Sequence, residues 1–179
     1  MLVLTFLSIL VVSVSAVTYF GIIAEPTVTI NQASVIFEQG DDWATGSSMG
    51  TNSTYVSLAV KAYPNATLTY DEHLNISNTD ASAHNVRLRH VSIAPASGSA
   101  SISNFTFVNF TLIQPDGTPV TGSDFDYTTS ADVWTTPSDM TYQSLGASTE
   151  WAVKIETRAT AGATGALTCT IVIAVDIQE

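Results

Sequence analysis

Most of the chain alternates between apolar and polar positions in the way that half-buried strands do. From Pro26 onward the alternating runs are short, and residues that favour turns separate them. No run has the spacing of an amphipathic helix. The pattern predicts roughly seven to nine strands. The last strand is the clearest, because its alternate residues are all apolar: Leu167, Cys169, Ile171, Ile173, Val175 and Ile177.

Earlier alternating runs predict the remaining strands. The alternation slips by one position at Val91, which indicates a β-bulge, and Pro115 with Gly117 indicates a turn. Residues 120–148 are rich in Thr, Ser and Asp, so we expect long surface loops there, with short strands near Val133 and Met140. The other expected strands lie within Val28–Phe37, Val56–Val60, Leu68–Ile76, Val86–Ile93, Phe105–Leu112 and Trp151–Ile155.

This succession of short strands favours a mainly β fold. We expect an antiparallel β-sandwich over residues 26–179, either immunoglobulin-like or jelly-roll. A parallel sheet is excluded because its crossover connections need helices. Cys169 alternates with apolar neighbours and is therefore expected to be a small buried side chain. A single cysteine forms no intramolecular disulfide.

The first 24 residues follow a different pattern. Met1–Ala24 contains no charged residue, and Glu25 and Pro26 end the segment. As a helix it would be apolar on all sides and about 36 Å long, which is enough to cross a bilayer. We therefore expect a hydrophobic helix over residues 1–25 that serves in assembly or as a membrane anchor.

Three fates are open to this segment. It is a secretory signal peptide cut after Val14-Ser15-Ala16, a retained membrane anchor, or a retained segment whose basic flank lay upstream and was removed. The first two usually have Lys or Arg nearby, whereas the nearest charge here is Glu25. The missing basic flank is explained best by the third fate.

Charge excludes several kinds of partner. The chain of 179 residues has 5 Lys and Arg against 16 Asp and Glu, a net charge of −11, and only 12% charged residues. So few basic residues cannot neutralise a row of phosphates, so we expect neither nucleic acid nor anionic lipid as a partner. The apolar content of 45% excludes a disordered chain.

The chain also has more glycosylation sequons than chance predicts. Asn-x-Ser/Thr occurs at five positions, and enrichment in Ser and Thr alone would give roughly two. The excess indicates an exported glycoprotein whose polar surface consists of hydroxyls and sugar rather than charge. Simple enrichment in Ser and Thr is the alternative. The candidate sites are Asn52, Asn65, Asn75, Asn104 and Asn109.

Candidate chemistry is otherwise sparse. The acidic pairs Asp41-Asp42, Asp71-Glu72 and Asp124/Asp126 lack the spacing of a calcium loop, so solvated carboxylates are expected. His73, His84 and His90 have no zinc-ligand spacing, and no nucleophile elbow or phosphate loop occurs. We expect no catalytic residue, no metal site and no cofactor. Arg87-Leu88-Arg89 places two guanidinium groups on one strand face, where they can pair with carboxylates of the same molecule or a neighbour.

An apolar N-terminal segment joined to a Ser/Thr-rich, sequon-bearing sandwich resembles the subunits of archaeal type IV pili and related surface filaments. In that family a peptidase removes a basic leader, and the retained helices bundle as the filament core beneath glycosylated sandwiches. Thr5 stands where bacterial pilins have a glutamate. The resemblance implies assembly through Leu2, Leu4, Phe6, Leu7, Leu10, Val14, Val17, Phe20 and Ile23.

The same resemblance implies a structural protein of the cell surface, not an enzyme. Its main partner would be further copies of itself in a helical homopolymer, after residence in the membrane. Contacts with a host surface or with neighbouring filaments would give adhesion and biofilm formation.

Three alternatives stay open. Val17–Phe20 and Thr27–Phe37 are rich in β-branched and aromatic residues, so after cleavage at Ala16 they are suited to complete the sheet of the next subunit as a donor strand. That mode resembles the TasA-like filaments. A membrane-anchored accessory protein that binds the surface layer is another alternative, and a secreted sandwich hydrolase ranks last.

Overall fold

A computed structural model describes residues 33–95, 102–164 and 167–178 of the chain. The compact unit that contains the strands runs over Gln32–Glu179. The helix expected over residues 1–25 and the first half of the strand expected from Val28 lie outside the described residues.

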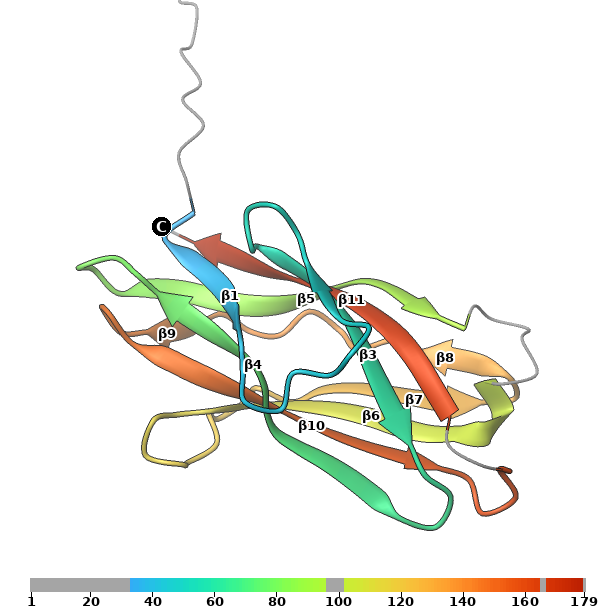
Figure 1. Cartoon of the computed structure of the whole chain (residues 1–179). Helices are drawn as coiled ribbons and strands as arrows, with labels where there is room; N and C mark the ends of the chain where they lie inside the picture. The colour runs from blue at the N-terminus through green and yellow to red at the C-terminus, as the bar shows by residue number, and fades with distance from the viewer. Residues whose placement is uncertain (1–32, 96–101, 165–166, 179) are drawn as a thin grey trace, which may run out of the picture. The chain divides into compact units, whose positions relative to one another are not determined.

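The described residues are mainly β (Figure 1). The only helical element among them is a short 3-10 helix, η1 (Ile102–Asn104). The strands are β1 (Val35–Gln39), β2 (Ser48–Met49), β3 (Tyr55–Ala62), β4 (Thr67–Asn78), β5 (His84–Ala94), β6 (Phe105–Ile113), β7 (Phe125–Ser130), β8 (Val133–Thr135), β9 (Gln143–Leu145), β10 (Glu150–Ala159) and β11 (Leu167–Gln178).

The strands form two antiparallel sheets. One has six strands in the order β1-β4-β10-β6-β7-β8, and the other has five in the order β2-β3-β11-β5-β9. The pairs of strands are nested in the sequence: β3 pairs with β11, β4 with β10, β5 with β9, and the consecutive strands β6 and β7 with each other. From β3 to β6, consecutive strands therefore alternate between the sheets.

Alternation within each strand gives each sheet one apolar face. In β10, Trp151, Val153 and Ile155 are buried, whereas the residues between them are partly exposed. In β11, Cys169 and Ile171 are buried in the same way, as the sequence predicted. The inward residues of both sheets form one hydrophobic core, which gives a sandwich-like arrangement.

Several local predictions are confirmed. The register between β5 and β11 shifts between Val172 and Ile173, at the predicted bulge around Val91. The predicted turn closes with a hydrogen bond from the Gly117 N–H to the Gln114 carbonyl (2.9 Å), with Gly117 at a φ of 82°. A short strand, β8, is present near Val133.

The interpretation of residues 120–148 is partly wrong. They include a six-residue strand, β7, that sequence reasoning assigned to a loop. Phe125 and Tyr127 of β7 are fully buried, while the polar residues between and after them made the segment look like surface. The short strand expected near Met140 is present just after it as β9, and Met140 itself lies in the preceding loop with its side chain buried in the core.

A buried amide ties the two sheets together at one end of the unit. Asn78 at the end of β4 is 1% exposed. Its Nδ2 donates to the carbonyls of Ser82 (2.9 Å) and Gly146 (2.8 Å), and its Oδ1 accepts from the Asp80 N–H (3.0 Å). These bonds link the β4–β5 loop to the β9–β10 loop, which belong to different pairs of strands.

We expect Asn78→Ala to lower the free energy of unfolding by about 1 to 3 kcal/mol, because the three hydrogen bonds of this buried amide are lost. Asn85→Ala is the matched control, since Asn85 is exposed and should change the stability by less than about 0.5 kcal/mol. Thermal and urea unfolding followed by circular dichroism would measure both. Equal effects of the two substitutions would contradict this role of Asn78.

Candidate functional site

The proposed assembly residues, from Leu2 to Ile23, all lie outside the described residues. Among the residues that are described, no helix is long and apolar enough to span a membrane. The structure therefore informs on the glycosylation sites, the charged clusters, the histidines and the sheet edges.

Two of the five sequon asparagines are exposed at turns. Asn52 lies in the loop between β2 and β3, and Asn65 follows Pro64 in the β3–β4 turn. Asn65 has a φ of 60°, a left-handed conformation that asparagine tolerates better than most residues. The Tyr63 and Ala66 pair closes this turn as an isolated bridge. Both side chains are therefore open to an enzyme that modifies the amide nitrogen.

The other three sequon asparagines are less accessible. Asn75 in β4 is 6% exposed, and its Nδ2 donates to Glu72 Oε1 at 2.7 Å. It lines a cavity of about 320 Å³ together with Glu72 and Glu150. The Oδ1 of Asn109 in β6 is buried without a hydrogen-bond partner among the described residues. Asn104 ends η1 and is half-exposed.

The acidic pairs do not form a ready metal site. Asp42 Oδ2 accepts hydrogen bonds from the backbone N–H groups of Asp71 (2.9 Å) and Glu72 (3.4 Å), so this carboxylate fastens a loop to β4. Burial, followed by the charge of Asp124, raises the pKa of Asp126. Within the described ranges, no three Asp, Glu, His or Cys side chains converge in a way that suits a metal ion.

The three histidines lie apart and have different environments. His84 contacts Asp80 (3.0 Å) at one end of the unit, and His90 Nδ1 lies 2.9 Å from the hydroxyl of Tyr127. Burial lowers the pKa of His90. The structure therefore brings no two of these residues into one site.

His73 is the most unusual of the three. Its side chain is fully buried, with its ring 5.8 Å from that of Trp43 and 4.8 Å from that of Tyr70. Its Nδ1 has no hydrogen-bond partner among the described residues, and its Nε2 lies 3.5 Å from the Ser47 hydroxyl. Burial lowers its pKa to about 4, against the opposing effect of the Asp42 carboxylate.

The paired arginines are satisfied within the molecule. Arg87 and Arg89 both donate to the Asp176 carboxylate on the neighbouring strand β11, at 3.1 Å and 2.9 Å. Arg87 also reaches Asp139 (3.2 Å) and lies over the ring of Tyr142. The sequence left open whether these arginines pair with carboxylates of the same molecule or of a neighbour, and the structure places carboxylates of the same chain beside them.

Sequence reasoning missed an open edge on β5. On its outer side this strand pairs with β9 only over His84–Val86, and no other backbone hydrogen bond among the described residues covers the stretch up to Ala94. Val91, in the middle of this stretch, is 48% exposed. The open edge of β5, defined as Arg87–Ala94, is thus a place where a further strand can add. The sequence does not show this open edge, because it depends on which strands pair with β5, and these strands are distant in the sequence.

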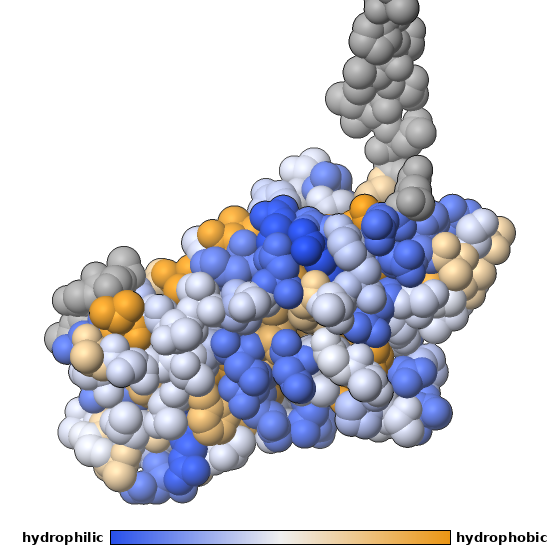
Figure 2. All heavy atoms as spheres, turned by 180° about the vertical axis from the view of Figure 1, so that it is seen from behind, coloured by the Kyte–Doolittle hydropathy of each residue, from blue (hydrophilic) through white to orange (hydrophobic). Residues whose placement is uncertain are grey.

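The remaining surface has no large apolar patch on the face shown in Figure 2, where hydrophobic side chains form small separate groups among hydrophilic ones.

The chain matches no model of a known protein family, and no curated protein shows a significant sequence match to it.

Acid should destabilise the protein through His73. Its pKa is lower in the folded state than the ordinary value of 6.5, so the folded state prefers the neutral ring. The free energy of unfolding therefore has its full contribution from the neutral His73 ring above pH 6.5, and this contribution is lost as the pH falls to about 4. The loss should reach about 3 kcal/mol.

The substitution His73→Phe keeps an aromatic ring against Trp43 and Tyr70 but cannot take up a proton. We expect its unfolding free energy to fall less than that of the wild type between pH 6.5 and 4, as measured by urea unfolding at a series of pH values. Parallel curves for the two proteins would contradict the assignment to His73.

Glycosylation should follow exposure. Peptide mass spectrometry of the protein from its native cells should find sugar at Asn52 and Asn65 and none at Asn75, because the Asn75 amide nitrogen is buried against Glu72. Full occupancy of Asn75, or bare side chains at both turns, would contradict this ranking.

Proposed function

We propose that this protein is a structural subunit of an extracellular surface filament that polymerises through its apolar N-terminal segment. The observation that carries the proposal is the absence of charge over residues 1–24 in a chain that also contains a compact β unit. The role is structural rather than enzymatic, and the place of action is the cell surface.

The energetic argument concerns where the apolar segment is buried. Its large side chains represent a gross burial free energy above ~20 kcal/mol, an upper bound that still exceeds the net stability of a domain. The core of the described residues is already filled by side chains of both sheets. Burial against further copies of the segment, after an initial stay in the membrane, satisfies this requirement.

The finer features of the fold belong to the same proposal. We assign residues 1–25 to a helix that forms the filament core. We assign the two sheets to the jelly-roll class rather than the immunoglobulin class. The nested pairing of β3 with β11, β4 with β10, β5 with β9 and β6 with β7 supports that choice.

The outer surface of such a filament would consist of the sheets and their sugars. Exposed sequons at Asn52 and Asn65 support this role, as does the low proportion of charged residues. Contacts with a host surface or with a neighbouring filament would be made by this layer.

A second joint between subunits is favoured by one specific observation, the open edge of β5. A strand from the N-terminal region of another copy would find unpaired backbone there, along with the exposed Val91. In this version the subunit is a TasA-like donor-strand filament protein. A membrane-anchored accessory protein is the third reading, and it predicts no filament.

Electron cryomicroscopy of the full chain tests the proposal. We expect filaments with a helical centre, and we expect the chain without residues 1–24 to be monomeric with its β structure intact by circular dichroism. Filaments that persist after this deletion would overturn the role of the segment. Full chains that stay in the membrane without polymerising would indicate the accessory protein.

Two matched substitutions separate the joints. Val91→Lys places a charge on the open edge of β5, which blocks strand addition. Val133→Lys does the same on β8, where Val133 is 50% exposed. A helical core leaves filaments in both variants, whereas strand addition at β5 predicts their loss in Val91→Lys alone.

A further inference from the structure

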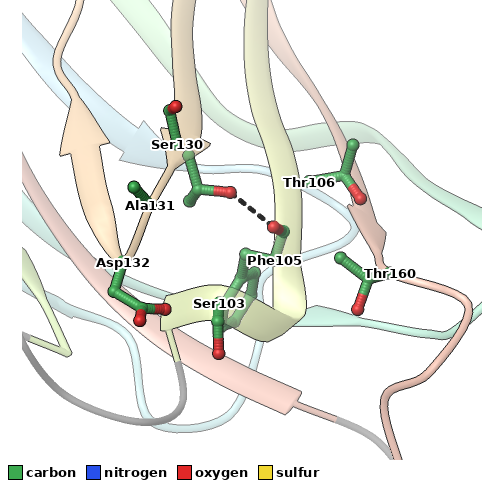
Figure 3. A pocket seen from close by; sticks show the side chains of 8 residues that line it. Ser103, Phe105, Thr106, Ser130, Ala131, Asp132 and Thr160 are labelled. Atoms are coloured by element: carbon green, nitrogen blue, oxygen red, sulfur yellow. Dashed lines mark hydrogen bonds between the residues drawn. The ribbon is translucent and has the colours of Figure 1, made fainter.

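One end of the β unit carries a pocket with an unusual lining. Its volume is about 270 Å³, and it lies between the start of β6, the β7–β8 turn and the residue that follows β10 (Figure 3). We name it the hydroxyl pocket. Its described lining consists of Ser103, Phe105, Thr106, Thr129, Ser130, Ala131, Asp132 and Thr160.

We propose that the hydroxyl pocket binds one neutral sugar unit. Five of its eight described lining residues carry a hydroxyl, and Asp132 adds a carboxylate. A hydroxyl both donates and accepts, which matches the hydroxyls of a sugar, and a carboxylate accepts two of them. The Thr129 hydroxyl, which donates to a carbonyl of the protein, is left as an acceptor. The volume lies near the lower limit of ~300 Å³ for small-molecule pockets, which suits a single ring.

The same lining argues against other ligands. None of its eight described residues is Lys, Arg or His, and Asp132 would repel an anion. A lipid chain would leave the hydroxyls without partners, at a cost in free energy. The side chain of Phe105 is 1% exposed and belongs to the core, so it offers a ligand no aromatic face.

The pocket is held in shape by its own structure. Thr129 Oγ1 donates to the Phe105 carbonyl, which fastens the β7–β8 turn to the start of β6 (Figure 3). Ala131 and Asp132 have φ values of 49° and 63°, left-handed conformations that glycine and asparagine adopt at less cost. The turn thus has a carboxylate in the lining of the pocket at a position where a common turn sequence has glycine.

A sugar can reach this pocket from two sources. The sequon Asn104-Phe105-Thr106 borders it, since Ser103 and Thr106 on either side of the acceptor line the pocket. The first sugar attached to Asn104 is therefore one source, and a free or neighbouring saccharide is the other. The site does not depend on how the subunits assemble.

Saturation-transfer NMR on the full chain from its native cells tests the proposal, with a panel of neutral monosaccharides as probes. Mass spectrometry of the same material establishes whether Asn104 carries sugar. If Asn104 is bare, we expect a neutral monosaccharide to bind the wild type. If Asn104 is glycosylated, we expect the free sugar to bind only the Asn104→Gln variant, whose pocket is empty.

In either case Asp132→Asn should weaken binding about tenfold, because a charged acceptor is lost. Thr160→Val, which keeps the shape of the side chain, should also weaken binding and is an independent second test of the pocket. Asp71→Asn, an exposed carboxylate of β4, is the matched control and should have no effect. No transfer from any sugar to a vacant pocket, or equal effects of the pocket variants and the control, would overturn the proposal.

Discussion

Burial of two sheet faces against each other is the interaction on which the rest of this structure depends. Each long strand contributes alternate apolar residues to one core, and that core contains side chains from Val35 to Val175. The strands β10 and β11, which have the clearest apolar alternation, lie at the centre of their sheets. Polar groups that sit between the layers need partners inside. Asn78 has them, whereas His73 Nδ1 has none among the residues that the structure describes.

Because the sheets pack face to face, unpaired backbone groups lie at the sheet edges. Three of the four edge strands, β2, β8 and β9, have two or three residues, which limits the length of backbone open to other chains. Since β9 covers only a quarter or so of β5, one longer stretch stays open around Val91. Side chains hold both ends of this stretch, through Arg87 with Asp139 and through Trp134 with the Pro95 carbonyl (3.1 Å). Both ends of the open edge of β5 are therefore fastened to neighbouring segments by side chains.

Features that depend on neighbouring residues could be predicted from the sequence. The alternation of β10 and β11, the bulge near Val91 and the turn at Gly117 follow from side-chain periodicity and backbone preference, and the structure has all of them. The strand β7 was missed because its outward residues are Asp and Thr, so that two buried aromatic rings carry its whole apolar signal. Exposure of the sequons was equally out of reach, because Asn75 is buried by strands and loops distant in sequence.

The net negative charge limits how the β units could contact one another in the filament that we propose. Two of the five basic side chains are occupied by Asp176, so the acidic excess remains on the surface of the molecule. Neighbouring copies of such a surface repel one another, and salt screens that repulsion within about 10 Å. Ion pairs between the β units are thus a poor basis for a polymer of this chain. In the filament that we propose, cohesion would come from groups without charge, and the uncharged N-terminal segment and the open backbone of β5 are two candidates.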